Sequence, residues 1–181
     1  METDHNKIIT ISRNCDATMI PAGEKIILIE GTHVRVTQSL GGNFTILVNG
    51  NLVKVLGEDA DALGLEKEIK KENKVSSRLA NENDIWDAMK QCFDPEIPVN
   101  IVDLGLIYDL EISDQKEGKN IHIRMTLTAP GCGMGPSIAQ DVETKVTSLN
   151  GINNVDVELV WDPQWDRNMM SEEAKLQLGM L

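Results

Sequence analysis

The chain has 181 residues, which is enough for one or two small domains with cores of their own. Hydrophobic residues make up 41% of the chain and charged residues 25%, as in ordinary soluble globular proteins, whereas aromatic residues reach only 3%. The formal net charge of −12 argues against a nucleic-acid phosphate backbone as a partner.

The cysteine pattern and the N-terminus indicate a cytoplasmic protein. The three cysteines, Cys15, Cys92 and Cys132, form no CxxC pair, and the first residues lack the basic-then-apolar order of a signal peptide. No apolar run approaches the roughly 18 residues that span a bilayer. We therefore expect a reducing, cytoplasmic setting and no membrane partner.

Residues 8 to 57 read as short strands separated by turn signals. Asn49-Gly50 between two apolar runs is the clearest hairpin signal in the chain. Several strands in about fifty residues predict a small closed or nearly closed β-barrel, within a β-rich domain at residues 1–65. We expect Cys15 to be buried there and His33 to be a surface or hydrogen-bonding residue.

Residues 66–80 carry a dense mixture of charges and contain five of the 17 basic residues. This composition predicts a solvated linker, partly helical, between two domains.

Residues 81–167 predict an α+β two-layer sandwich in the order helix, strand, strand, helix, strand. The first helix begins near Asn83 and is expected to end at Asp94-Pro95, because a residue before proline is pushed out of the helical region. Its apolar face places Cys92 in the core. In the second strand alternate residues face inward, so His122 is expected on the other face. Residues 168–181 read as a short helical tail capped by Ser171.

A glycine-rich turn, Thr128 to Pro136, separates the second strand from the second helix and contains Cys132. The glycines allow a close approach of other groups, and Pro136 suits the first turn of a helix. A helix N-terminus stabilises negative charge and lowers thiol pKa values, so Cys132 is a candidate thiolate. The alternative is a tight turn whose cysteine is a small buried hydrophobe.

Three groups of residues together resemble the metal–sulfur cluster assembly domain shared by the SufT family, PaaD and the eukaryotic cytosolic iron–sulfur targeting factors. They are Asp94-Pro95-Glu96-Ile97-Pro98, residues 102–108 and the loop from Thr128 to Cys132. Further segments are similar to hallmarks of the SufT family in particular: residues 20–23, 38–42, 59–64, 161–163 and 170–175. Many relatives have Cys-Pro at the loop cysteine, where this chain has Cys132-Gly133.

The resemblance implies a non-enzymatic accessory factor in iron–sulfur cluster assembly or in delivery to client apoproteins. A transient iron–sulfur cluster or iron is the implied cargo, with Cys132 as its metal ligand. Because a cluster normally takes four thiolates, a homodimer, an assembly partner or a small thiol must supply the others. The expected binding residues are Cys132, Thr128, Gly131, Gly133, Asp94, Glu96 and Asp103. For Asp103 the alternative role is to accept backbone hydrogen bonds within its own turn.

Three rival functions follow from the same residues. A thiol hydrolase would need a base such as His122 within reach of Cys132. A phosphate-binding loop would need Lys-Ser or Lys-Thr where Pro136-Ser137 stands. An adaptor that bridges assembly proteins and clients without binding metal is the third.

Overall fold

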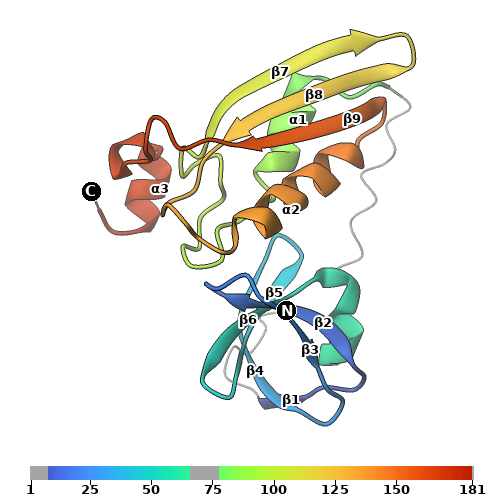
Figure 1. Cartoon of the computed structure of the whole chain (residues 1–181), viewed down its shortest axis with the longest axis vertical. Coiled ribbons are helices and arrows are strands. Elements are labelled where there is room, and N and C mark those ends of the chain that lie inside the picture. The colour runs from blue at the N-terminus through green and yellow to red at the C-terminus, as the bar shows by residue number, and fades with distance from the viewer. Residues whose placement is uncertain (1–7, 66–77, 181) are drawn as a thin grey trace. The chain divides into compact units, whose positions relative to one another are not determined.

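The computed structural model describes residues 8–65 and 78–180. The chain divides into two compact units, residues 1–74 and 75–181, which we describe separately (Figure 1). Most of the predicted linker, residues 66–77, lies outside the described residues. Within the described part, no helix is both long and apolar enough to cross a membrane.

The first unit is a six-stranded antiparallel sheet with the order β1-β4-β5-β6-β2-β3. The sequence predicts a closed or nearly closed barrel, but the edge strands β1 and β3 are not paired with each other, so the sheet is open and a closed barrel is not formed. The strands are β1 (Ile8–Thr10), β2 (Cys15–Ile20), β3 (Lys25–Leu28), β4 (His33–Leu40), β5 (Asn43–Val48) and β6 (Asn51–Val55), followed by the 3-10 helix η1 (Gly57–Leu63).

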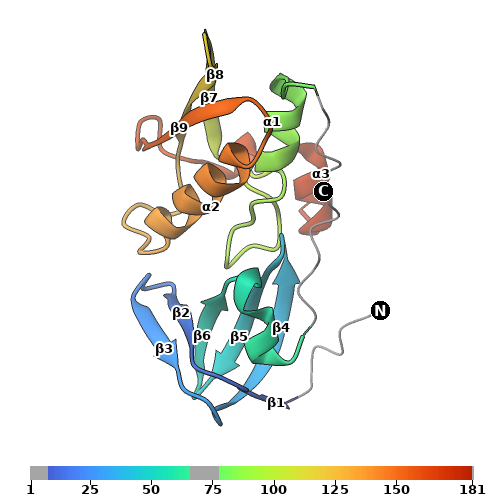
Figure 2. The same cartoon turned by 90° about the vertical axis from the view of Figure 1, so that its right-hand side faces the viewer.

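The sheet curls because two of its ladders belong to one bent hairpin (Figure 2). Ile8 pairs with Arg35 and Cys15 pairs with Leu28, so residues 8–20 and 25–40 keep a single register past the bend. Alternate side chains of β4 and β5 enter the core, as expected for half-buried strands. Asn49 and Gly50 have φ values of 50° and 81°, the left-handed conformation that a two-residue hairpin loop requires.

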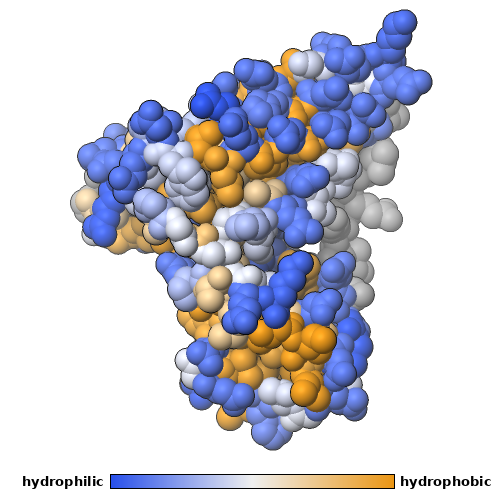
Figure 3. All heavy atoms as spheres, viewed as in Figure 1, coloured by the Kyte–Doolittle hydropathy of each residue, from blue (hydrophilic) through white to orange (hydrophobic). Residues whose placement is uncertain are grey.

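The predictions for Cys15 and His33, both in this unit, are confirmed. Cys15 is buried at 5% exposure, and the exposed His33 ring hydrogen-bonds to the hydroxyl of Thr10 at 3.1 Å. The visible face of the unit also carries hydrophobic atoms (Figure 3), and its exposed apolar side chains include Ile8, Ile27, Ile29, Leu52 and Leu56.

The second unit has the element order that the sequence predicts, and the mixed α and β class is confirmed. It contains α1 (Glu82–Met89), β7 (Ile107–Gln115), β8 (Gly118–Met125), α2 (Gly135–Thr147), β9 (Ile152–Leu159), η2 (Arg167–Met169) and α3 (Glu172–Gln177). The sheet order is β7-β8-β9, with β7 antiparallel and β9 parallel to β8. Both α1 and α2 lie on one face of this sheet (Figure 1).

Strand β8 shows why this face is the core. Its inward residues Ile121, Ile123 and Met125 are at most 1% exposed, and they meet the apolar stripe of α2. The opposite face of the sheet is polar. Residues that lie opposite one another in a ladder share a face, so charged residues of β8 and β9 meet there. There His122 and Arg124 lie across from Asp156 and Glu158 of β9.

Helix α1 ends at Met89, earlier than the Asp94-Pro95 boundary expected from the sequence. The carbonyl of Cys92 accepts a hydrogen bond from the N–H of Ile101 at 2.9 Å, and Phe93 forms a bridge with Asn100. These long-range pairings compete with helical hydrogen bonds and turn the chain before the proline is reached. Cys92 is still fully buried, as predicted.

An ion pair at the start of α1 gives a prediction for the pH dependence of stability. The hydrogen bond from Arg78 at 2.7 Å, together with the backbone N–H of Asn81, holds the pKa of Asp84 below its ordinary value. Ionised Asp84 therefore stabilises the fold above its unfolded-state pKa, and this contribution is lost as the pH falls through the lower folded-state pKa. In Asp84→Asn, we expect a smaller decrease of unfolding free energy between pH 6 and pH 3, a range chosen around the ordinary aspartate pKa of about 3.9.

Urea unfolding at several pH values measures this difference. Asp87→Asn, an exposed acid on the same helix, is the matched control and should keep the parental pH profile. If both variants have the same profile, the Arg78–Asp84 pair contributes nothing to the pH dependence.

Candidate functional site

The loop between β8 and α2 places Cys132 just before the first turn of the helix. Gly135, the first residue of α2, donates its N–H to the carbonyl of Cys132 at 3.1 Å, and the Cys132 N–H donates to Ala129 at 3.3 Å. Pro136 lies in the first helical turn, as predicted. Cys132 is partly exposed, whereas Cys15 and Cys92 are buried.

Two glycines of this loop serve different purposes. Gly131 has φ of 75°, and a Cβ atom added there would meet nothing within 4 Å, so the backbone angle alone requires glycine. At Gly135 a Cβ atom would lie 2.7 Å from Leu127 and 3.3 Å from Leu159. The absence of a side chain lets the N-terminus of α2 approach the ends of both parallel strands, which holds the cysteine loop at this edge of the sheet.

Asp94 connects a second predicted segment to this loop. The residue is only 5% exposed, and its Oδ1 accepts hydrogen bonds from the backbone N–H groups of Glu96 at 2.8 Å and Ile97 at 2.9 Å. Its Oδ2 faces the hydroxyl of Thr128, which donates a long hydrogen bond at 3.5 Å. The buried carboxylate therefore has one well-satisfied oxygen and one oxygen with a weak donor, directed at the cysteine loop.

Asp103 is held within its own turn. Its Oδ2 accepts a hydrogen bond from the Asn100 side chain at 2.6 Å, and its N–H donates to the Asn100 side-chain oxygen at 2.9 Å. These contacts hold Asp103 in its own turn, as the alternative role expects, but the donor to its carboxylate is the Asn100 side chain and not the backbone.

The structure thus brings together only part of the predicted site. Asp94 and Thr128 are in contact, and Thr128, Gly131 and Gly133 share the loop of Cys132. The Glu96 side chain is exposed, and the backbone N–H of this residue donates to Asp94. Across residues 8–65 and 78–180, no group of three or more His, Cys, Asp and Glu side chains lies close enough to hold a metal ion.

His122 is engaged by other residues on the outer face of the sheet. Its Nδ1 lies 2.8 Å from Asp156, and its Nε2 lies 3.5 Å from Glu158, both on β9. Both ring nitrogens thus face carboxylates of the neighbouring strand, and this geometry does not support a histidine–cysteine hydrolase.

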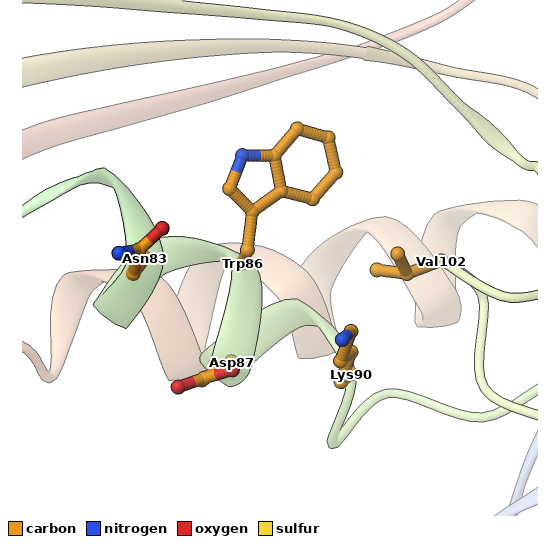
Figure 4. A pocket seen from close by; sticks show the side chains of 5 residues that line it. All are labelled: Asn83, Trp86, Asp87, Lys90 and Val102. Carbon is orange, nitrogen blue, oxygen red and sulfur yellow. The ribbon is translucent and has the colours of Figure 1, made fainter.

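A surface hollow of about 550 Å³ lies beside α1, and none of its lining residues is among the predicted site residues. It is lined by Asn83, Trp86, Asp87 and Lys90 of α1 and by Val102 (Figure 4). The indole of Trp86 projects from the helix in this view, and its Nε1 hydrogen-bonds to Glu82 at 3.3 Å.

The sequence did not predict the observed contacts of three residues near the site. Asn100 caps the turn of Asp103, and the spacing Asn-x-x-Asp could have indicated this. The hydroxyl of Thr126, at 1% exposure, has no hydrogen-bond partner among the described residues. Thr126 follows β8, which ends at Met125, so the side-chain alternation of the strand does not extend to Thr126. Trp165 donates its indole N–H to the carbonyl of Leu104 at 2.8 Å, a contact with no local signal.

Comparison with known proteins identifies the family. A family model described as iron–sulfur cluster assembly protein matches residues 82–159. An Fe-S protein maturation auxiliary factor of Porphyromonas gingivalis is 45% identical over 103 residues, which cover 95% of that relative and 57% of this chain. The chain belongs to the iron–sulfur cluster assembly protein family.

Two further relatives have similar identity to this chain. The auxiliary factor YitW of Bacillus subtilis is 41% identical over 101 residues, covering 96% of YitW and 56% of this chain. The auxiliary factor SufT of Staphylococcus aureus is 42% identical over 87 residues, covering 96% of SufT and 48% of this chain. The predicted resemblance to the SufT family is confirmed, and the family match lies within the second unit.

Proposed function

We propose that this protein is an accessory factor in iron–sulfur cluster assembly or in delivery of clusters to client proteins. The observation that carries the proposal is family membership over the unit that holds Cys132, in a chain whose other two cysteines are buried. Its relatives are named auxiliary factors of Fe-S protein maturation, which supports a non-enzymatic role.

In this proposal Cys132 is a transient ligand of iron or of an iron–sulfur cluster, which is the cargo. Thiolate sulfur is the ligand that such clusters take, and a partly exposed cysteine in an uncrowded loop can exchange them. Because one thiolate cannot complete a cluster, the remaining ligands come from an assembly protein, a client apoprotein or a second copy of the chain. A cluster that is held by only one bond to this protein is easily transferred to another protein.

Client activity in cells separates this proposal from the adaptor alternative. In a bacterial strain that depends on this chain, Cys132→Ala should reduce the activity of an iron–sulfur client enzyme to the level of the deletion strain. Cys15→Ala, at a buried position in the other unit, should keep the parental activity. If Cys132→Ala supports full client activity at equal protein levels, the adaptor function is correct and the ligand role is wrong.

The charge of Asp94 gives a second test of the site. Asp94→Asn keeps an oxygen for the N–H groups of Glu96 and Ile97 but removes the negative charge, whereas Asp94→Ala removes both. We expect Asp94→Asn to lower iron–sulfur uptake about 10- to 100-fold, as for outer-shell partners of metal ligands. Its unfolding free energy should change by about 1 kcal/mol or less, while Asp94→Ala should lose about 1–3 kcal/mol.

Anaerobic reconstitution followed by visible absorption measures uptake, and urea unfolding measures stability. Parental uptake by Asp94→Asn, combined with loss of stability in Asp94→Ala, would limit Asp94 to building its turn.

A further inference from the structure

The segment that follows β9 docks onto the loop joining α1 to β7. Three hydrogen bonds connect them: from the indole of Trp165 to Leu104 O at 2.8 Å, from the N–H of Ser171 to Asp103 O at 2.8 Å, and from the side chain of Gln177 to Pro98 O at 2.9 Å. At the start of the segment, Pro163 O accepts from the hydroxyl of Tyr108 at 2.8 Å. Figures 1 and 2 both show α3 beside this loop.

The docked surfaces are in close contact. Gly105 has φ of 74°, and a Cβ atom added there would clash with the carbonyl oxygen of Met169. Met170 and Ala174 are at most 5% exposed. The backbone of the C-terminal segment therefore packs directly against the backbone of the loop, with buried side chains next to the contact.

The loop itself is braced. Besides the bond between Ile101 and Cys92 and the Phe93–Asn100 bridge, the N–H of Leu104 donates to the carbonyl of Asn100 at 3.0 Å. Ile101 and Leu104 are fully buried. Packing and hydrogen bonds along a loop give a physical route by which a displacement at one end can reach the other.

At its other end this loop meets the cysteine loop through Asp94 and Thr128. The C-terminal segment therefore contacts the braced loop, and the braced loop contacts the loop of Cys132. We propose that residues 163–177 form a latch that positions the Cys132 loop, with Trp165 as a positioning residue, and that release of the latch increases access to the Cys132 thiol. The use of this latch in cluster handling rests on the proposed function, whereas the positioning itself does not.

Alkylation of the native full-length protein tests the latch without any metal. Trp165→Phe removes the indole donor to Leu104 and keeps an aromatic ring. We expect iodoacetamide to modify Cys132 about fivefold faster in this variant, the factor for losing one hydrogen bond of average strength. Mass spectrometry of tryptic peptides gives the rates for all three cysteines separately. Trp161→Phe is the matched control, because Trp161 is 45% exposed and should leave the rate unchanged.

Cys92 reports whether the second unit has simply loosened. It is fully buried, so its rate must stay at the parental value while that of Cys132 rises. A parallel rise at Cys92, or no change at Cys132, would overturn the latch. Gln177→Ala is a second variant at an exposed position, where folding is not at risk, and it should raise the Cys132 rate in the same direction. The two proposals can fail separately. If alkylation confirms the latch but Cys132→Ala supports normal client activity, the positioning role stands and only the proposed cluster role is wrong.

Discussion

Cys132→Ser should lose almost all iron–sulfur absorption after anaerobic reconstitution. A serine hydroxyl has the shape of the thiol but stays protonated near neutral pH, and thiolate sulfur is the ligand that clusters require. Loss of an outer-shell partner typically lowers metal affinity about 10- to 100-fold, so loss of the ligand itself should lower it by at least about 100-fold. Iron and acid-labile sulfide bound per chain, measured together with the visible spectrum, give the result.

Cys15→Ala is the control for the number of thiols. Burial, together with the charge of Asp59, raises the pKa of the Cys15 thiol, which keeps it protonated and unsuitable as a ligand. This variant should therefore bind as much iron and sulfide as the parent. Bands of parental strength in Cys132→Ser would exclude the thiolate role and leave the adaptor function.

Gly105→Ala should destabilise the second unit more than Gly131→Ala, the same substitution at a glycine of nearly equal φ. A residue with a side chain costs about 1–2 kcal/mol in this conformation. The clash with the carbonyl of Met169 adds about 1–3 kcal/mol, because either the loop or the C-terminal segment must move. We therefore expect a loss of about 2–5 kcal/mol in unfolding free energy.

Gly131→Ala isolates the contribution of the contact. Its φ of 75° nearly equals the 74° of Gly105, but its surroundings are open, so only the conformational cost of about 1–2 kcal/mol applies. Urea unfolding followed by tryptophan fluorescence reports on the second unit, since all three tryptophans, Trp86, Trp161 and Trp165, belong to it. Equal losses in the two variants would mean that the backbone of Met169 yields at no cost and that the docking is loose.

The two experiments address different parts of the same arrangement. The serine variant tests whether the sulfur takes the cargo, and the glycine pair tests how firmly the C-terminal segment is seated. A firmly seated segment combined with an inactive thiol would support an adaptor with a rigid surface. A functional thiol combined with a loosely seated segment would support the cluster role without the latch.

Much of the fold follows from local sequence. Alternation in residues 121–125 predicted the buried row of β8, Asn49-Gly50 predicted the hairpin of β5 and β6, and Ser171 caps α3 by accepting the N–H of Ala174 at 3.1 Å. The position of Cys132 before a helix was likewise readable, because glycine, proline and a change of hydrophobic period mark a strand-to-helix turn. These features depend on neighbouring residues, whose preferences act over a few positions of the chain.

Tertiary structure decided the features that depend on distant pairings. Helix α1 ends at Met89 because residues 92–93 pair with residues 100–101, and the first sheet stays open because β1 and β3 are not paired with each other. The contact of Asp94 with Thr128 and that of Trp165 with Leu104 join residues 34 and 61 positions apart. No local propensity encodes such contacts, since they form only when packing has already brought separate segments to the same edge of the sheet.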